Sequence, residues 1–302
     1  MLRFYDKPLD AETVLRDGTH RAASLDETWR KLITPGALRR AGITRVAELT
    51  GLDTLGIPVF AAIRPMGKSL STQQGKGIKQ EAARVSAIME AFETFSAEEL
   101  TLPIVRGSYR GLRKKHNVVD VRKLPRPRGR LDLDATWRWV EGFDLIAGEP
   151  ILVPEQAVTL DTTFRRRPVF DISSNGLASG NVLVEAIVHG LCEVFERDAE
   201  AAWRRSGRDR RVVLDSIEDP SCHSLIDRIT ATGARVFVWD LASELEICAI
   251  GCAIMEDPHE PAWRTLGLYQ GFRRASDARD RDRARAHRSR ANAPYLHRGR
   301  AR

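Results

Sequence analysis

The stretch SSNGLASGNVLVEAIVHGLCEVFERDAE, residues 173–200, joins a loop rich in glycine, serine and asparagine to a strongly patterned helix. At about 100° per residue, Glu185 and Glu196 differ by only about 20° around the helix axis, and Glu193 lies about 60° from Glu196. The other side of the helix carries Ala186, Ile187, Leu191, Val194 and Phe195. That apolar surface is enough to pack on a sheet, so the stretch predicts a core helix that also bears three carboxylates.

An earlier stretch, STQQGKGIKQEAARVSAIMEAFETFSAE at residues 71–98, has the same plan: a glycine loop, then a helix on which Glu90 and Glu93 lie one turn apart. Neither loop is a Walker A loop or a dinucleotide fingerprint, and a single ExxE on a helix is usually a solvated face. Five carboxylates that share one cavity, however, need protons or cations to compensate them. Oxygen ligands alone favour Mg²⁺ held against phosphates. A helical di-iron site is the competitor; it would need Glu-x-x-His pairs, and His189 lies four residues from its nearest glutamates.

Composition and termini point to an ordinary globular protein. Of the 302 residues, 42% are apolar and 29% are charged, a mixture that can bury a sizeable core. No apolar run approaches the roughly 18 residues of a membrane span. The N-terminus MLRFYDKPLDAETV has acidic residues where a signal peptide would have its apolar core, so we expect a cytoplasmic location.

The net charge of +7 is carried by the last tenth of the chain. Residues 273–302 hold 11 Arg and 3 Asp with no Lys or Glu, which leaves −1 for residues 1–272. Nucleic acid is therefore not an expected partner.

The four cysteines are Cys192, Cys222, Cys248 and Cys252. A zinc site could be assembled from three of them with His223, but ELEICAIGCAI reads as a buried strand, which favours small buried thiols.

Hydrophobic periodicity along the chain predicts an α+β fold, with strands in hairpins and long helices packed on them. Expected helices begin with a capping box at Ser24 and Glu27 and continue with 36–49 (broken by Gly42), 78–99, 182–201 and HSLIDRITATG. Expected strands are 57–65, a hairpin over 136–158 turned at 147–149, and an antiparallel pair formed by ARVFVWDLAS and EICAIGCAIMED. The two loop–helix units suggest at most a distant internal repeat.

Three linked runs resemble YcaO-domain proteins: SxxxExxE at Ser86, Glu90 and Glu93, then SNGLASGN, then ExxxxxxxExxER over residues 185–197. The likeness extends over residues 18–271. It implies a fold of mixed and antiparallel sheets packed with long helices around a central ATP cleft. It also implies an ATP- and Mg²⁺-dependent enzyme in which a nucleophile adds to a peptide-backbone amide, ATP phosphorylates the resulting oxyanion, and phosphate leaves. A Cys, Ser or Thr nucleophile would give an azoline, and sulfide would give a thioamide.

The resemblance also assigns residues by position. Four glutamates would hold Mg²⁺: Glu90, Glu93, Glu193 and Glu196. Six residues would contact the nucleotide or its phosphates: Arg21, Thr28, Ser86, Asn181, Glu185 and Arg197. Thr94 stands where an arginine often follows the second glutamate, which leaves one phosphate contact missing or replaced.

The opening GTHR…ET and GITRVAELTGLDTLGIPVFAAIRP look most like YcaO proteins that act with a TfuA partner in thioamide formation. The implied partners are a peptide or protein substrate, a TfuA-like protein and a second copy of the chain. The implied domain division is an N-terminal part at 1–65, a catalytic core at 66–272 and an aberrant tail at 273–302.

The tail, FRRASDARDRDRARAHRSRANAPYLHRGRAR, departs from the family's C-terminal pattern, which contributes an active-site arginine and a proline-rich end. With permitted codons from Arg273 onward, a shift of one nucleotide reads GAHLTPEIAIARARTEAAQTRLTFIAGAR, which follows that pattern. We therefore hypothesise a frameshift near codon 272; an intact reading frame in the resequenced gene would refute it. A basic arm for nucleic acid or an acidic partner is the rival interpretation. As printed, the tail is expected to be disordered.

Three functions remain open on these grounds. The first is ATP-dependent activation of a peptide amide. The second is a catalytically impaired remnant that only binds a peptide or a partner protein. The third is an ordinary phosphotransferase that uses the same carboxylates.

Overall fold

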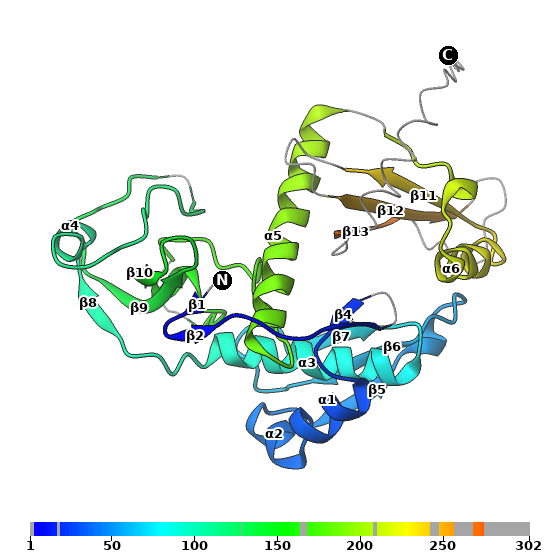
Figure 1. Ribbon diagram of the computed structural model, residues 1–302, viewed down its shortest axis with the longest axis horizontal. Coiled ribbons are helices and arrows are strands. Elements are labelled where there is room, and N and C mark those ends of the chain that lie inside the picture. Colours follow the sequence, from blue (N-terminus) through cyan, green and yellow to red (C-terminus); the bar gives the residue numbers. More distant parts are fainter. Residues whose placement is uncertain are drawn as a thin grey trace. The chain divides into compact units, whose positions relative to one another are not determined.

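The computed structural model describes residues 3–16, 19–127, 129–163, 168–207, 210–241, 248–256 and 268–274. The chain divides into two compact units, the first formed by residues 1–52 and 56–190 and the second by 53–55 and 191–302. Figure 1 shows the helices and strands of each. Within the described ranges, no helix combines the length and apolar character that crossing a membrane requires. The predicted disorder of the tail at 273–302 is wrong for Arg273 and Arg274, which end a strand; residues 275–302 lie outside the description, so for them it stays a prediction.

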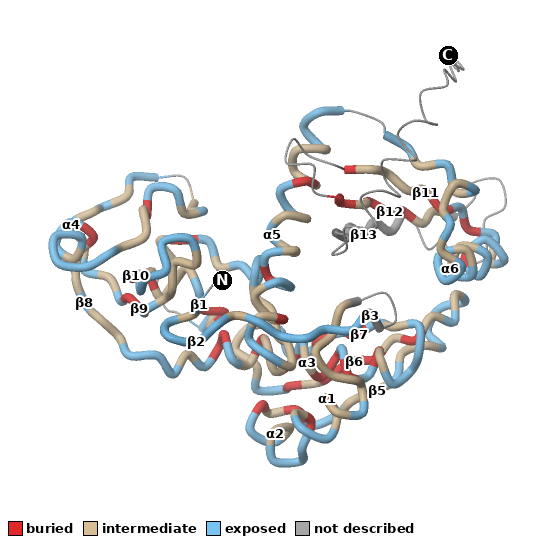
Figure 2. The backbone as a smooth tube through the Cα atoms, viewed as in Figure 1, coloured by how far each residue is buried: buried red, intermediate tan, exposed pale blue. Residues whose placement is uncertain are grey.

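The first layer of unit 1 is an antiparallel sheet covered by one long helix. Its strand order is β5 (Arg45–Glu48), β6 (Val59–Ile63) and β7 (Thr72–Lys76). The helix α3 (Gln80–Glu98) lies across this sheet, with α1 (Leu25–Leu32) and α2 (Pro35–Arg40) nearby (Figure 1). Buried residues concentrate on β6 and the inner side of α3 (Figure 2). Helix α3 therefore gains its stability from the burial of one apolar side, while its other side remains free to carry function.

Local signals set the ends of these elements. The predicted capping box is confirmed, because the Ser24 hydroxyl accepts from Glu27 N and the Glu27 carboxylate accepts from Ser24 N. The prediction of a broken helix over 36–49 is wrong in its second half. After Gly42, which has φ of +71°, the chain turns into β5 and pairs with β6. Tertiary pairing overrides the helical preference of this short alternating segment.

Close approach of α3 to β7 depends on Gly75. A Cβ built on Gly75 would lie 2.0 Å from Ala87 N and 2.3 Å from Ala83 O, both of them backbone atoms. We expect Gly75→Ala to destabilise unit 1 by about 1–3 kcal/mol, because the helix must move away from the sheet. Gly51→Ala is the matched control, since nothing lies within 4 Å of its built Cβ. Urea unfolding of both variants measures the difference, and equal midpoints would contradict the close contact.

The second layer of unit 1 is the antiparallel sheet β10 (Glu149–Pro154), β9 (Trp137–Asp144) and β8 (Val105–Gly107). The predicted hairpin at 136–158 is confirmed, with Gly148 at φ of +74° in its turn. Around it lie α4 (Tyr109–Leu112) and the 3-10 turn η2 (Glu155–Ala157). Trp139, Val121 and Phe170 are fully buried in its core.

Short N-terminal elements complete unit 1. They are the pairs β1 (Arg3–Phe4) with β2 (Lys7–Pro8) and β3 (Val14–Arg16) with β4 (Thr19–Arg21), and the 3-10 turn η1 (Thr50–Leu52). No prediction from periodicity was made for them, because two or three residues are too few to display a period.

A third three-stranded antiparallel sheet organises unit 2. Its strands are β11 (Ala234–Asp240), β12 (Ala249–Glu256) and β13 (Leu268–Arg274), accompanied by α6 (Pro220–Thr230) and η3 (Leu214–Ser216). The predicted antiparallel pair is confirmed by the register from Ala234↔Glu256 to Asp240↔Ile250. Ala199 and Trp203 of α5 (Leu183–Ser206) pack against Leu241 and Ala249. The first residues of α5 belong to unit 1 and the remainder, from Leu191, to unit 2.

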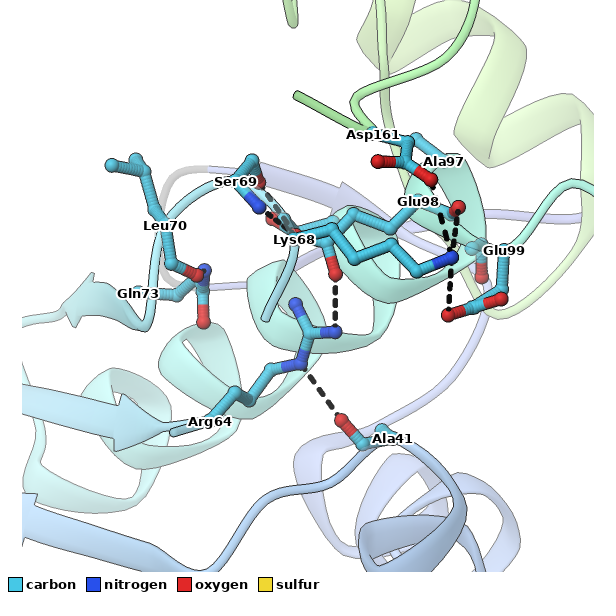
Figure 3. A network of polar contacts seen from close by, with 12 residues as sticks. Ala41, Arg64, Lys68, Ser69, Leu70, Gln73, Ala97, Glu98, Glu99 and Asp161 are labelled. Atoms are coloured by element: carbon cyan, nitrogen blue, oxygen red, sulfur yellow. Dashed lines mark hydrogen bonds and ion pairs between the residues drawn. The ribbon is translucent and has the colours of Figure 1, made fainter. Parts of the chain in front are cut away.

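A buried ion pair fixes the C-terminal end of α3 (Figure 3). Arg64 Nη2 lies 2.6 Å from Glu98 Oε2, and the two side chains are 4% and 1% exposed. Arg64 Nε donates to Ala41 O at 2.7 Å, and the backbone N and hydroxyl of Ser69 donate to Glu98 Oε1 at 2.9 and 2.6 Å. The segment between β6 and β7 is thereby tied to the helix that bears Glu90.

A second tie lies on the solvent side of this pair. Lys68 Nζ lies 2.8 Å from Glu99 Oε1 and 3.2 Å from Asp161 Oδ2. The Glu99 carboxylate, against some loss of hydration and with help from Asp161, raises the pKa of Lys68. For Glu98, burial alone would raise the pKa, but hydrogen bonds from Arg64 and Ser69 outweigh it and hold the pKa below its usual value.

Candidate functional site

One polar group of unit 1 surrounds Glu185, in the first turn of α5. Its side chain is 5% exposed and accepts from Arg21 Nη1 at 3.0 Å and from Ala22 N at 3.1 Å. Arg21, at the end of β4, is itself 38% exposed. The buried carboxylate thus orients a guanidinium group that still reaches solvent, an arrangement suited to holding an anion.

Asn181 extends this group toward α1. Thr28 Oγ1 donates to Asn181 Oδ1 at 2.8 Å, and Asn181 Nδ2 lies 3.5 Å from both Glu185 oxygens. Thr28 is buried and sits in the first α1 turn after the capping box. The structure therefore brings together four residues assigned from the resemblance to nucleotide contact, although two come from the N-terminus and two from the middle of the chain.

The residues assigned on α3 share its outer side. Ser86 and Glu90 are exposed and Glu93 is half-buried, at the spacing i, i+4 and i+7 of a single helix face. Thr94 lies on the inner side, where it is buried and its hydroxyl donates to Glu90 O at 2.9 Å. Thr94 is therefore neither charged nor turned outward, and it does not take the place of the expected arginine.

Within unit 2, the assigned residues of α5 surround one arginine. Arg197 lies 3.6 Å from Glu193, 3.8 Å from Glu196 and 3.5 Å from Glu200. Arg197 is 45% exposed, and the three glutamates are between 15% and 25% exposed. Glu200 was not among the predicted site residues, although its spacing of three from Arg197 on a helix is the signal that identifies it.

The two glycine loops meet their helices in the same way. A Cβ on Gly77 would lie 2.8 Å from Ala83 N, and a Cβ on Gly180 would lie 2.7 Å from Ala186 N, each six residues further on. The same offset of 103 residues that relates Gly77 to Gly180 also relates Glu90 to Glu193 and Glu93 to Glu196. The suspected internal repeat therefore has a structural counterpart, because both helices begin against a glycine that admits no side chain.

The donor set fits Mg²⁺ in its chemistry, since all four assigned ligands are carboxylates. Within the described ranges, no group of three or more His, Cys, Asp or Glu side chains is gathered as a preformed metal centre. In unit 2, Arg197 lies among the carboxylates.

Comparisons with known proteins show the family to which the chain belongs. The family model described as YcaO cyclodehydratase, ATP- and Mg²⁺-binding, matches residues 74–272. A protein of Rhizobium leguminosarum bv. trifolii encoded in the tfuA 3' region is 36% identical over 82% of this chain and 62% of its own length. An uncharacterised Mycobacterium tuberculosis protein is 34% identical over 83% of this chain and 61% of its own length. The chain therefore spans little more than three fifths of the length of these relatives.

Solved structures agree with the fold. YcaO from Methanopyrus kandleri bound with AMPPCP and Mg²⁺ is 25% identical and superposes with a TM-score of 0.66 over 86% of this chain and 64% of that chain. A heterocyclase in complex with substrate and cofactor is 22% identical, with a TM-score of 0.72 over 89% of this chain and 39% of that chain. The predicted α+β fold of mixed helices and antiparallel sheets is confirmed.

Proposed function

We propose, from the premise that this chain belongs to the YcaO family, that it uses ATP and Mg²⁺ to activate a backbone amide of a ribosomally made peptide or protein. The overall change replaces the amide oxygen. A nucleophile forms a bond to the amide carbon, the oxygen takes the γ-phosphoryl group of ATP with release of ADP, and inorganic phosphate then departs with that oxygen.

The observation that supports this proposal is the group formed by Arg21, Thr28, Asn181 and Glu185. In our proposal Arg21 and Asn181 hold the nucleotide, and the buried Glu185 carboxylate orients both. The buried Glu185 carboxylate is paired with Arg21 and accepts a hydrogen bond from Ala22 N, so its polar atoms are not left unsatisfied.

Glu90, Glu93, Glu193 and Glu196 are the proposed Mg²⁺ ligands, and Ser86 and Arg197 the proposed phosphate contacts. When bound, Mg²⁺ neutralises phosphate charge and orients the γ-phosphoryl group. Arg197 would retain part of its contact with Glu200 while it faces the phosphates. The glutamates lie on helices rather than on loops, which keeps their positions fixed while substrate binds.

Thioamide formation is the branch that we favour over azoline formation. A relative 36% identical to this chain is encoded beside tfuA, so we propose a TfuA-like protein as the partner that brings the sulfur nucleophile. We place the reaction in the cytoplasm, with a homodimer as the working state. A TfuA-like gene beside this gene would support the thioamide branch, whereas a neighbouring cyclodehydratase partner with a dehydrogenase would favour azoles.

Calorimetric titration tests the nucleotide site without a known peptide. We expect the 302-residue chain to bind Mg-ATP saturably, and Asn181→Ala to weaken binding about tenfold, since one good hydrogen bond to a charged group is lost. Asn117→Ala is the control, because the Asn117 side chain donates to Glu149 Oε1 and Pro150 O and is assigned no part in nucleotide binding. Absence of binding by calorimetry and by equilibrium dialysis would instead favour a remnant that binds only peptides. A phosphorylated product without amide modification would favour an ordinary phosphotransferase.

A further inference from the structure

Residues 105–130 form a strongly basic segment that the overall charge conceals. They contain ten Lys and Arg residues and one acidic residue, Asp120, although residues 1–272 as a whole carry a net charge of −1. We call residues 105–130 the cationic segment. Six of its described basic side chains are exposed and are not joined to a carboxylate: Arg106, Arg113, Lys114, Lys115, Lys123 and Arg130.

The backbone of the cationic segment is held in place by the core of its unit. Tyr109 and Val121 are buried, at 3% and 0% exposure. Leu152 N donates to Asn117 O at 2.9 Å, Val119 N donates to Leu152 O at 3.0 Å, and Arg110 N donates to Leu133 O at 3.3 Å. The charges are therefore carried on a fixed support, unlike those of a free basic tail.

A single helical turn directs part of this charge outward. Hydrogen bonds from Arg113 N to Tyr109 O and from His116 N to Leu112 O continue the helical path of α4. Arg110, Arg113 and Lys114 have the spacing i, i+3 and i+4 and so lie on one side of that turn. Tyr109 and Leu112 occupy the inner side and pack in the core.

Carboxylates of this chain neutralise only a small part of the positive charge of the cationic segment. Asp120 accepts from Arg122 Nε at 2.7 Å and Nη2 at 2.8 Å, and chiefly through these bonds the pKa of Asp120 falls to about 2. Arg110 Nη1 lies 2.8 Å from Asp134 Oδ2, and Arg113 stacks over the Tyr109 ring. For Arg106, Lys114, Lys115, Lys123 and Arg130 no ion pair exists within the described part of the chain.

We propose that the cationic segment is a binding surface for an acidic, Asp- and Glu-rich segment of another polypeptide. Arginine forks bind carboxylates with two parallel hydrogen bonds, as Arg122 already does with Asp120. A patch of one sign also draws an oppositely charged partner from a distance and is weakened by salt. The proposal stands apart from nucleotide binding, because it uses none of the residues assigned to ATP or Mg²⁺.

The local chemistry favours a polypeptide over a nucleic acid. Surfaces for single-stranded nucleic acid combine basic grooves with exposed aromatic rings on which bases stack. Here the nearby rings are taken up by the core: Tyr109, Trp139 and Phe170 are at most 3% exposed, and Trp137 packs against both Trp139 and Phe170. The single turn after α4 is also too short to fill a major groove.

Fluorescence anisotropy with a labelled 20-residue peptide of alternating glutamate and glycine tests the proposal, with no nucleotide present. We expect saturable binding by the 302-residue chain at low salt and about tenfold weaker binding by the triple variant Arg106→Gln/Lys114→Gln/Lys115→Gln. The matched control is Lys7→Gln/Lys31→Gln/Arg39→Gln, which removes three exposed positive charges elsewhere on unit 1 and should change the affinity less than twofold.

Three outcomes would overturn the proposal. The first is no binding of the acidic peptide by the unaltered chain in 50 mM salt. The second is an equal loss of affinity in both triple variants, which would show that binding depends on the net charge of the chain and not on the cationic segment. The third is tighter binding of an oligothymidylate of equal charge, which would assign the surface to nucleic acid. Because the assay contains no ATP, its outcome is independent of whether the proposed amide activation is correct.

Discussion

Peptide-dependent release of phosphate from ATP is expected to fall about a hundredfold or more in Glu193→Gln. The substitution keeps the size of the side chain but removes one anionic ligand from the proposed Mg²⁺ site. Loss of a charged ligand weakens the hold on Mg-ATP and misplaces the γ-phosphoryl group, so both kcat and kcat/KM should fall. Phosphate release with a peptide substrate, measured over a range of Mg²⁺ concentrations, gives the result. Excess Mg²⁺ should recover part of the activity.

Glu200→Gln is the matched control for this experiment. Glu193 and Glu200 both lie on α5 and both contact Arg197, at 3.6 and 3.5 Å, yet only Glu193 is assigned to Mg²⁺. Glu200→Gln weakens the contacts of Glu200 with Arg197 and Arg204 but removes no proposed metal ligand, so we expect turnover to change by about threefold at most. Equal activity of the two variants would refute the metal assignment, whatever the absolute rate. The frame of the gene beyond codon 272 needs to be verified before either variant is measured.

Breaking the Arg64–Glu98 pair is expected to cost about 3–5 kcal/mol of the free energy of unfolding. In Arg64→Met the Glu98 carboxylate stays buried and keeps only its hydrogen bonds from the backbone N and the hydroxyl of Ser69. Urea unfolding measures the loss. Arg110→Met is the control, because the side chains of Arg110 and Asp134 are 63% and 65% exposed and such pairs contribute about 0–1 kcal/mol.

The pH dependence of this effect follows from the lowered pKa of Glu98. A carboxyl whose pKa is lower in the folded state binds fewer protons there than in the unfolded chain. Its stabilising contribution is therefore complete above the ordinary value of 4.5 and is lost as the pH falls through the folded value. Glu98→Gln should be much less stable than the unaltered chain at neutral pH, and the difference should narrow in acid. A difference that stays constant down to low pH would show that packing, rather than charge, dominates.

Strong local patterns made much of this fold predictable. The predicted helices at 78–99 and 182–201 correspond to α3 and α5, because each combines a glycine loop with an extended apolar face. The hairpin turned at Gly148 was equally visible, since its position at φ of +74° suits glycine. The prediction of a helix after Gly42 was wrong for the opposite reason. A short alternating run fits a helix or a strand, and here pairing with β6 makes it a strand.

The remaining features depend on contacts between distant residues. The pairs Arg21–Glu185 and Arg64–Glu98 join residues that are 164 and 34 positions apart in the sequence, and no local sequence pattern predicts these contacts. The assignments of Arg21 and Glu185 came from family resemblance, whereas the Arg64–Glu98 pair was not anticipated. The cationic segment was missed because a single net charge averages it against acidic residues elsewhere in the chain.

The contact of each glycine loop with its helix has a consequence for how this chain can vary. Ala83 lies seven residues before Glu90, and Ala186 lies seven residues before Glu193, so both carboxylates follow their loop contact by two helical turns. Apart from Ser86, a proposed phosphate contact, the side chains between these points can change on the solvent side, but the number of residues cannot. One inserted residue would rotate the carboxylates behind it by about 100° and carry them off their face. Insertions and deletions should therefore be far rarer than substitutions in these two intervals, in any chain built on this plan.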